Sequence, residues 1–214
     1  MRLFLSSYRA GRHTDRLKEL LGDVKKVGVI TNAKDYKTPE GRRERVGEVF
    51  EFFESLGLEP KEVDLRPFFN KSGAPNQLIG YNFVWLAGGN PFLLRRALKY
   101  SGVDDFLISR VRDGSIIYGG ESAGALIVGP TLRYAEMDSD EDSPDYVAEG
   151  YKKEVIWDGL GFTDYMPVPH YQSEEYGPET QSYIQRLDQA VIKHKEMTDD
   201  QAILINNSKE EFLK

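Results

Sequence analysis

Short apolar runs alternate with longer amphipathic stretches along most of the chain, and this alternation restricts the fold more than any other feature of the sequence. The short runs predict strands, whereas apolar residues at helical spacing predict helices between them. Strands and helices that alternate in this way form a mostly parallel sheet that is covered by helices on both faces. We therefore expect an α/β fold around one central sheet.

The strands and helices can be placed along the chain from the same pattern. We expect strands at residues 2–7, 25–33, 59–65, 81–90, 115–121 and 202–208, and helices at residues 13–23, 38–58, 91–102, 103–114 and 183–196. In the second helix, Thr38 suits the N-cap, Pro39 suits the first helical position and Gly57 can close the end. The sequence contains no internal repeat, linker or low-complexity segment, so we expect a single domain over residues 1–214.

The composition disfavours several classes of protein. A net charge of −7 disfavours a nucleic-acid partner, because no basic face balances the phosphate repulsion. A mean hydropathy of −0.51 disfavours a membrane protein, and no apolar stretch approaches the roughly 20 residues that cross a bilayer. The chain contains no cysteine, which excludes a cysteine nucleophile and thiolate metal sites. The apolar part of the N-terminus is too short for a signal peptide, and a chain without cysteine suits a reducing compartment, so we expect a cytoplasmic protein.

A serine flanked by glycines follows the expected strand at residues 115–121. Residues 120–124, GESAG, match the G-x-S-x-G pattern of a nucleophile at a strand-to-helix turn. In such a turn Ser122 has a strained backbone, small neighbours let strand and helix approach, and the amide of Ala123 can face a developing oxyanion. An ordinary tight connection that needs small residues fits the same pattern. The stretch AGGN at residues 87–90 offers unhindered amides at the same sheet edge, although a tight turn would also use glycines.

A serine nucleophile needs a base, and the chain contains three histidines. His13 follows the first strand in a basic loop, and His194 lies between two lysines in an expected helix, so we expect both to face solvent. His170 lies in the stretch YMPVPHYQ, where Pro167 and Pro169 restrict the backbone and so the direction of the imidazole. A packed structural histidine is the alternative for this position.

The stretches LAGGNPF, GGESAGA and PVPHY, in this order and at this spacing, resemble the dipeptidase E and cyanophycinase-like family of serine peptidases. The resemblance extends over nearly the whole chain. It implies a three-layer sandwich of the class I glutamine-amidotransferase-like (flavodoxin-like) fold, with Ser122 as nucleophile and His170 as general base. It also implies an oxyanion hole built from backbone amides near Gly88, Gly89 and Ala123, with Asn90 lining the substrate site.

The acid that would orient the histidine is less well defined by the sequence. An acid is needed to hold the imidazole tautomer and to stabilise the imidazolium that forms during attack. Asp199, just before the last expected strand, matches the position of the orienting carboxylate in the family, with Asp200 beside it. Asp138 or Glu136, in the acidic segment after the serine, is the alternative. Asp199 could also simply cap a turn.

The substrate that the resemblance implies is a small peptide, cleaved through an acyl-enzyme by a dipeptidase or exopeptidase. Aspartyl dipeptidases of the family bind the acidic P1 side chain with an arginine, and this chain has Gln181 at that position. Because a neutral amide cannot replace the charged fork of arginine, strict preference for Asp is not expected. Arg186 lies near enough in sequence to compensate, but a surface role is the simpler expectation.

Two other functions use the same features: a non-catalytic small-molecule binding protein, and an esterase or amidase acting on a non-peptide substrate. Three scattered histidines predict no metal site, and no phosphate loop or dinucleotide motif is present, so we expect no cofactor. The acidic segment at residues 135–145 would attract a free α-ammonium group if it borders the cleft. The sequence is compatible with a homodimer.

Overall fold

The computed structural model describes residues 1–71, 74–136 and 143–214. The strands are β1 (Arg2–Ser6), β2 (Lys26–Ile30), β3 (Glu59–Glu62), β4 (Phe83–Leu86), β5 (Ile117–Glu121), β6 (Met166–Val168), β7 (His194–Glu196), β8 (Ala202–Asn206) and β9 (Lys209–Leu213). The helices are α1 (Thr14–Leu21), α2 (Pro39–Ser55), α3 (Pro91–Ser101), α4 (Val103–Arg112), α5 (Ala123–Leu126) and α6 (Gly177–Gln189). Three short 3₁₀ helices, η1 (Asn32–Lys34), η2 (Arg66–Phe68) and η3 (Ala74–Leu78), lie in the connections.

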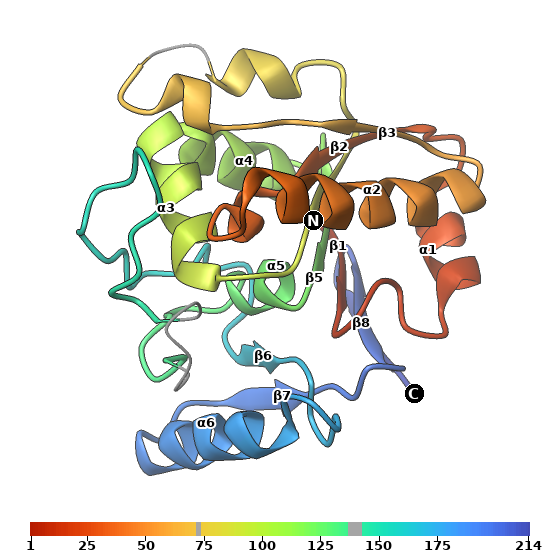
Figure 1. Ribbon diagram of the computed structural model, residues 1–214. Helices are drawn as coiled ribbons and strands as arrows, with labels where there is room; N and C mark the ends of the chain where they lie inside the picture. Colours follow the sequence, from red (N-terminus) through yellow and green to blue (C-terminus); the bar gives the residue numbers. More distant parts are fainter. Residues whose placement is uncertain (72–73, 137–142) are drawn as a thin grey trace.

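Seven strands form the central sheet in the order β3-β2-β4-β5-β1-β8-β9. The first five of these strands are parallel to one another, and β8 and β9 form an antiparallel hairpin at the edge beside β1. The expectation of a mostly parallel sheet is therefore confirmed. Strands β6 and β7 form a separate two-stranded parallel sheet, which lies with α6 at one end of the molecule (Figure 1).

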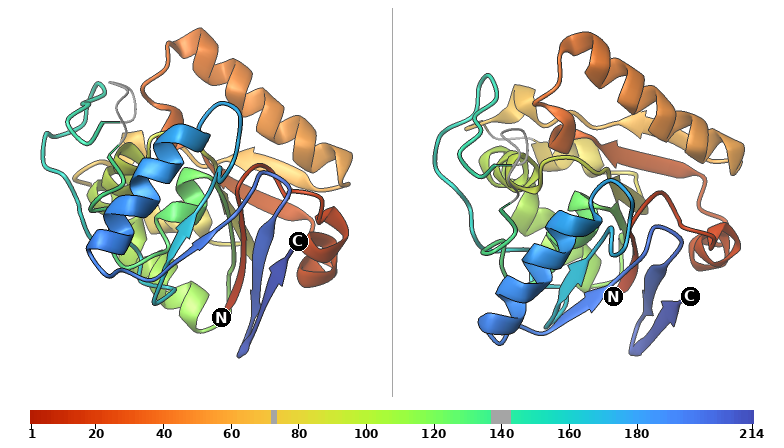
Figure 2. Two further views of the ribbon diagram at one scale, coloured as in Figure 1. Left: turned by 90° about the horizontal axis from the view of Figure 1, so that it is seen from below. Right: turned by 60° about the horizontal axis from the view of Figure 1, so that its bottom comes forward.

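Two apolar cores cover the two faces of the central sheet. Successive residues of a strand point to opposite faces, so Val84 and Leu86 of β4 enter the core formed with α3, α4 and α5. Phe83 and Trp85 of the same strand enter the second core, which is formed with α1 and α2. The result is the expected three-layer α/β sandwich, seen from two further directions in Figure 2.

The expected ends of α2 are also observed. The Thr38 side chain accepts a hydrogen bond from the amide of Gly41 at 3.2 Å, and Pro39 is the first residue of the helix. Gly57 follows the last turn with a φ of +77°, a conformation that glycine adopts at little cost.

The expected helix at residues 183–196 differs from the structure. Helix α6 begins at Gly177 and ends at Gln189, and His194 lies in β7. The apolar spacing continues past residue 189, but Val191 has a φ of +57° and is 90% exposed, so the chain turns there. The strand β7 then pairs with β6, a partner distant in sequence that local periodicity does not reveal. The last expected strand is likewise followed by a further one, β9.

The parallel strands bring their carboxyl ends to one edge of the sheet. Residues that follow β1, β2, β4 and β5 therefore meet there, and they include Ser7, Lys34, Gly88 and Ser122. The second sheet adds the segment after β6 and the connection from β7 to β8 to the same region, because His170 contacts both Ser7 and Ser122. Ligand sites of open α/β sheets lie at this edge.

Candidate active site

Ser122 occupies the sharp turn between β5 and α5. Its φ of +51° and ψ of −115° are unusual for a residue with a side chain, and its amide donates a hydrogen bond to the carbonyl of Ser6 at 3.0 Å. The glycines on either side are required by close packing. A Cβ atom on Gly120 would lie 2.4 Å from the carbonyl oxygen of Gly124, and one on Gly124 would lie 2.1 Å from the carbonyl oxygen of Leu86.

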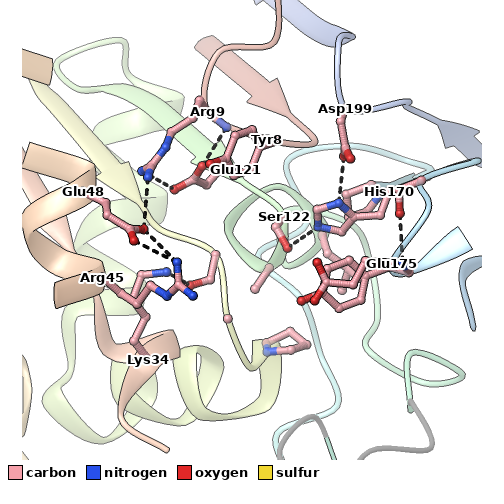
Figure 3. A pocket seen from close by; sticks show the side chains of 18 of the residues that line it. Tyr8, Arg9, Lys34, Arg45, Glu48, Glu121, Ser122, His170, Glu175 and Asp199 are labelled. Atoms are coloured by element: carbon pink, nitrogen blue, oxygen red, sulfur yellow. Dashed lines mark hydrogen bonds and ion pairs between the residues drawn. The ribbon is translucent and has the colours of Figure 1, made fainter. Parts of the chain in front are cut away.

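His170 follows β6 and faces the serine. Its Nε2 atom lies 2.9 Å from Oγ of Ser122, and its Nδ1 atom lies 2.8 Å from Oδ1 of Asp199 (Figure 3). The backbone of His170 has a φ of +63°, and its ring lies 4.9 Å from the ring of Tyr176 between centroids. A serine, a histidine and an aspartate thus form one hydrogen-bonded chain.

Asp199 lies in the connection between β7 and β8. The hydrogen bond with His170 holds the pKa of this carboxyl below its ordinary value, and a hydrogen bond from Ser7 acts in the same direction against the opposing effect of partial burial. The neighbouring Asp200 instead forms an exposed ion pair with Arg12 at 2.6 Å. Of the alternative acids, Asp138 lies outside the described residues.

Ser7 forms hydrogen bonds with both His170 and Asp199, and the sequence did not point to this residue. Its hydroxyl is fully buried; it accepts a hydrogen bond from the amide of His170 at 2.7 Å and donates one to Oδ1 of Asp199 at 2.6 Å. One side chain therefore contacts both the histidine and the aspartate. Nothing local in the sequence LSSYR distinguishes this residue, because both of its partners lie far along the chain.

The glycine-rich loop after β4 lies against the serine. A Cβ atom on Gly88 would lie 2.9 Å from Cβ of Ser122, and one on Gly89 would lie 2.4 Å from the carbonyl oxygen of Ala33, so side chains are excluded at both positions. Within the described part of the chain, the amides of Gly88, Gly89 and Ala123 have no hydrogen-bond acceptor. They are therefore available to a group bound beside Ser122.

The two polar residues expected to line the substrate site lie elsewhere. Asn90 is fully buried and caps α3, since its Oδ1 accepts a hydrogen bond from the amide of Leu93 at 2.8 Å. Gln181 is exposed on α6 and does not line the cavity beside Ser122. Arg186 donates hydrogen bonds to the carbonyls of Tyr134 and Glu136, at 3.1 and 2.6 Å, and so ties α6 to the segment after α5.

A cavity of about 700 Å³ opens beside Ser122 and Ala123. Its wall contains charged side chains of both signs, which come from separate elements: Arg9, Lys34, Lys37, Arg45, Glu48, Glu121, Glu174, Glu175 and Asp199. Among them, Arg9 forms ion pairs with Glu48 and Glu121, and Arg45 forms one with Glu48. In the part of the chain that the structure describes, Lys34, Lys37, Glu174 and Glu175 have no oppositely charged group within 4.0 Å.

The other two histidines lie away from this cavity. His13 occupies the N-cap position of α1, and His194 lies between the carboxylates of Asp188 and Glu196, each 3.0 Å away. Among residues 1–71, 74–136 and 143–214, no group of three or more His, Asp or Glu side chains is arranged to hold a metal ion. None of the helices in these ranges combines the length and the apolar character needed to cross a membrane.

Comparisons with known proteins agree with the expectations from the sequence. Residues 6–213 match the model of peptidase family S51. The uncharacterized peptidase Lmo0363 of Listeria monocytogenes is 30% identical over 132 residues, which are 61% of this chain and 60% of the relative. The uncharacterized peptidase PM1590 of Pasteurella multocida is 29% identical over 136 residues, 62% of this chain and 59% of the relative. The alignments thus span less than two thirds of these relatives.

Two solved structures have a similar fold. A crystal structure of a "Putative Peptidase E Protein" from Listeria monocytogenes superposes with a TM-score of 0.78 at 24% identity, covering 100% of this chain and 98% of the other. A peptidase from an acI-B1 Actinobacterium superposes with a TM-score of 0.61 at 13% identity, covering 100% of this chain and 90% of the other. The first similarity confirms the class I glutamine-amidotransferase-like fold.

Proposed function

The chain belongs to peptidase family S51, a family of serine peptidases, and we propose that it hydrolyses short peptides as a dipeptidase or exopeptidase. The observation that carries the proposal is the chain of hydrogen bonds that joins Ser122, His170 and Asp199, at 2.9 and 2.8 Å, at the wall of a cavity. A nucleophile, a base in contact with it and a carboxylate that orients the base are what acyl transfer requires.

In this reaction Oγ of Ser122 attacks the carbonyl carbon of the scissile peptide bond while Nε2 of His170 accepts the proton of the serine hydroxyl. Asp199 keeps the Nδ1 proton of His170 in place and stabilises the imidazolium that forms. The imidazolium then gives the proton to the leaving amine, and the C–N bond breaks to leave an ester on Ser122. A water molecule, deprotonated by His170, attacks this ester and releases the acid, which restores the serine.

The negative charge that develops on the carbonyl oxygen needs hydrogen-bond donors. The amides of Gly89 and Ala123 are the proposed donors, because they lie at the cavity wall beside Ser122 and have no acceptor in the described part of the chain. Ala123 is the first residue of α5, so its amide is held in place before substrate binds.

Charges in the cavity support a short peptide with free ends as the substrate. Lys37 comes from the segment after β2, and Glu174 and Glu175 come from the segment after His170. Among the described residues these groups have no oppositely charged partner, so the cavity offers positive and negative charges from different elements. A dipeptide carries one charge of each sign. The volume of about 700 Å³ falls within the range of about 300–1,000 Å³ that is typical of small-molecule sites.

We propose further that the enzyme does not require Asp at P1. Gln181 is neutral, and its exposed position on α6 leaves it outside the cavity wall. We expect kcat/KM on Asp-Leu to lie within about tenfold of the values on Glu-Leu, Ala-Leu and Leu-Leu, which is less than about 1.4 kcal/mol in the transition state. A hundredfold advantage for Asp-Leu would contradict this part of the proposal.

Labelling with a fluorophosphonate probe tests the catalytic residues before any substrate is known. We expect the wild type to be labelled at Ser122, and Ser122→Ala and His170→Ala to lose labelling. Asp199→Asn should label slowly, whereas the matched control Asp200→Asn, in the adjacent residue that pairs with Arg12, should label at the wild-type rate. Equal labelling of the two aspartate variants would exclude Asp199 from the mechanism, and an unlabelled wild type would contradict the proposal as a whole.

A panel of dipeptides, N-acetylated dipeptides and p-nitrophenyl esters then distinguishes peptide substrates from other acyl compounds. Hydrolysis of free dipeptides with a marked loss on N-acetylation is the expected result. Turnover of esters alone would favour an esterase.

A further inference from the structure

Lys34 lies in the cavity wall and contacts the glycine-rich loop rather than an acid. It is the last residue of η1, which follows β2, and its Nζ atom donates a hydrogen bond to the carbonyl oxygen of Gly88 at 2.8 Å. Burial lowers the pKa of this ammonium group, and the nearby Glu121 opposes that effect. Lys34 has no carboxylate within 4.0 Å among the described residues, so no ion pair neutralises its charge.

The carbonyl that Lys34 contacts belongs to the same peptide unit as the amide of Gly89. The described backbone contains no cis peptide bond, and in a trans peptide the C=O and N–H bonds point in opposite directions. The ammonium of Lys34 therefore lies at one end of this peptide dipole, and the N–H of Gly89 is the other end. Gly89 lines the cavity together with Ser122, and its N–H, which has no acceptor in the described part of the chain, is the proposed oxyanion donor.

The orientation of this peptide unit is not fixed by the residues themselves. Two successive glycines can rotate the plane between them at little cost, and a rotation would turn the N–H of Gly89 away from Ser122. Among the described residues, backbone hydrogen bonds hold this loop at its flanks, from the amide of Ala87 to the carbonyl of Ile30 and from the amide of Asn90 to the carbonyl of Ala33. The hydrogen bond from Lys34, by contrast, is made to the Gly88–Gly89 peptide itself, at the carbonyl oxygen of Gly88.

We infer that Lys34 is a positioning residue of the oxyanion hole, which orients the Gly88–Gly89 peptide and increases the donor strength of the Gly89 amide. The inference rests on the proposed function. A positive charge at the carbonyl end of the peptide favours the electron shift that makes its N–H a better donor. Since the oxyanion exists only in the transition state, Lys34 affects kcat more than KM.

A direct role of Lys34 in binding a substrate carboxylate is the competing explanation, and it predicts a different result. A residue that binds the carboxylate raises KM when it is removed, and only for substrates that carry that carboxylate. A residue that supports the oxyanion lowers the rate for every acyl or phosphonyl compound that reacts at Ser122.

The test compares Lys34→Met, which keeps the length of the side chain without its charge, with Lys34→Arg and with the matched control Lys71→Met. Lys71 also donates a hydrogen bond from Nζ to a backbone carbonyl, that of Pro67 at 3.0 Å, but it does not line the cavity. The first measurement is the rate constant of fluorophosphonate labelling, because its P=O oxygen occupies the oxyanion position and the probe carries no carboxylate. We expect a 10- to 100-fold decrease for Lys34→Met, less than the roughly 10²–10³-fold loss typical of a deleted oxyanion donor. Lys34→Arg should recover part of the rate, and Lys71→Met should stay within twofold of the wild type.

The second measurement uses a dipeptide and its C-terminal amide. For Lys34→Met, kcat should fall by the same factor on both, with KM changed less than threefold. Labelling within twofold of the wild type, or a KM increase confined to the free dipeptide, overturns the inference and leaves the proposed function intact. A wild type that is labelled at Ser122 but hydrolyses no peptide contradicts the proposed substrate, while the labelling rates still decide the role of Lys34.

Discussion

Replacing Ser7 by alanine should reduce catalysis more than it reduces stability. The hydroxyl is fully buried and makes two hydrogen bonds, one from the amide of His170 at 2.7 Å and one to the carboxylate of Asp199 at 2.6 Å. Its removal leaves the amide of His170 without an acceptor, which costs about 1–3 kcal/mol, and it deletes a bond to a charged group. The side chain of Asp199 is 45% exposed, so water replaces part of that second bond.

The expected loss of folding free energy for Ser7→Ala is therefore about 2 kcal/mol. The effect on catalysis comes from the loss of two restraints, on the backbone of His170 and on the carboxylate of Asp199. Small displacements of catalytic groups cost up to about 10²-fold, so we expect kcat to fall by about 10- to 100-fold, which corresponds to about 1.4–2.8 kcal/mol in the activation barrier. The KM should change little, because Ser7 does not line the cavity.

Steady-state kinetics and urea denaturation of the same preparation measure both effects. Ser101→Ala is the matched control, since Ser101 is also buried, lies at the end of α3 and shares its hydroxyl hydrogen between the carbonyls of Ala97 and Leu98. The control should lose some stability and keep the wild-type kcat. Ser7→Thr, which keeps a hydroxyl, should recover part of the rate. If Ser7→Ala loses about 2 kcal/mol of stability but keeps kcat within twofold, the residue is only structural and the reasoning is refuted.

Three further predictions concern the turn at the nucleophile and the pH dependence of stability. Gly124→Ala should cost on the order of 3 kcal/mol in urea denaturation, because its Cβ would lie 2.1 Å from the carbonyl oxygen of Leu86; a stable variant would mean that the turn relaxes. Tyr118→Phe should cost about 1–2 kcal/mol, because the buried hydroxyl, whose pKa is raised by burial, donates a hydrogen bond to Gly124 at 2.6 Å; an unchanged melting temperature would contradict this. The pKa of Asp199 is held below its ordinary value, so the wild type should be more stable than Asp199→Asn above pH about 4. This advantage should decrease as the pH falls through the lowered pKa. If the wild type and Asp199→Asn differ in stability by the same amount at pH 7 and at pH 3, Asp199 does not contribute in this way.

The sequence predicted those parts of the site that depend on local pattern. The short apolar runs identified the strands whose carboxyl ends meet, and the small residues around Ser122 reflect a packing requirement that the structure makes explicit at Gly120 and Gly124. The same local reasoning failed for α6, because amphipathic spacing continues beyond Gln189 while the backbone turns at Val191.

The sequence could not predict contacts that exist only after distant segments meet. Ser7 and Lys34 are ordinary residues of a strand end and a short connection, and each acquires its role from a partner far along the chain: His170 and Asp199 for Ser7, Gly88 for Lys34. Sequence reasoning finds a nucleophile because its turn has a local signature. It does not find a residue that positions another residue, because a hydroxyl or an ammonium group can serve in that way from any segment that folds into place.

The end of β1 contacts both strained residues of the proposed catalytic chain, and this explains how two unfavourable backbone conformations persist together. Ser122 and His170 both have positive φ values, which cost about 1–3 kcal/mol each. The carbonyl of Ser6 accepts the amide hydrogen of Ser122, and the hydroxyl of Ser7 accepts that of His170. Because Ser6 and Ser7 are adjacent, one dipeptide sets the positions of the nucleophile, on the central sheet, and the base, on the second sheet, relative to each other. A change at β1 should therefore alter the distance between Ser122 and His170 even where the substituted side chain never meets the substrate.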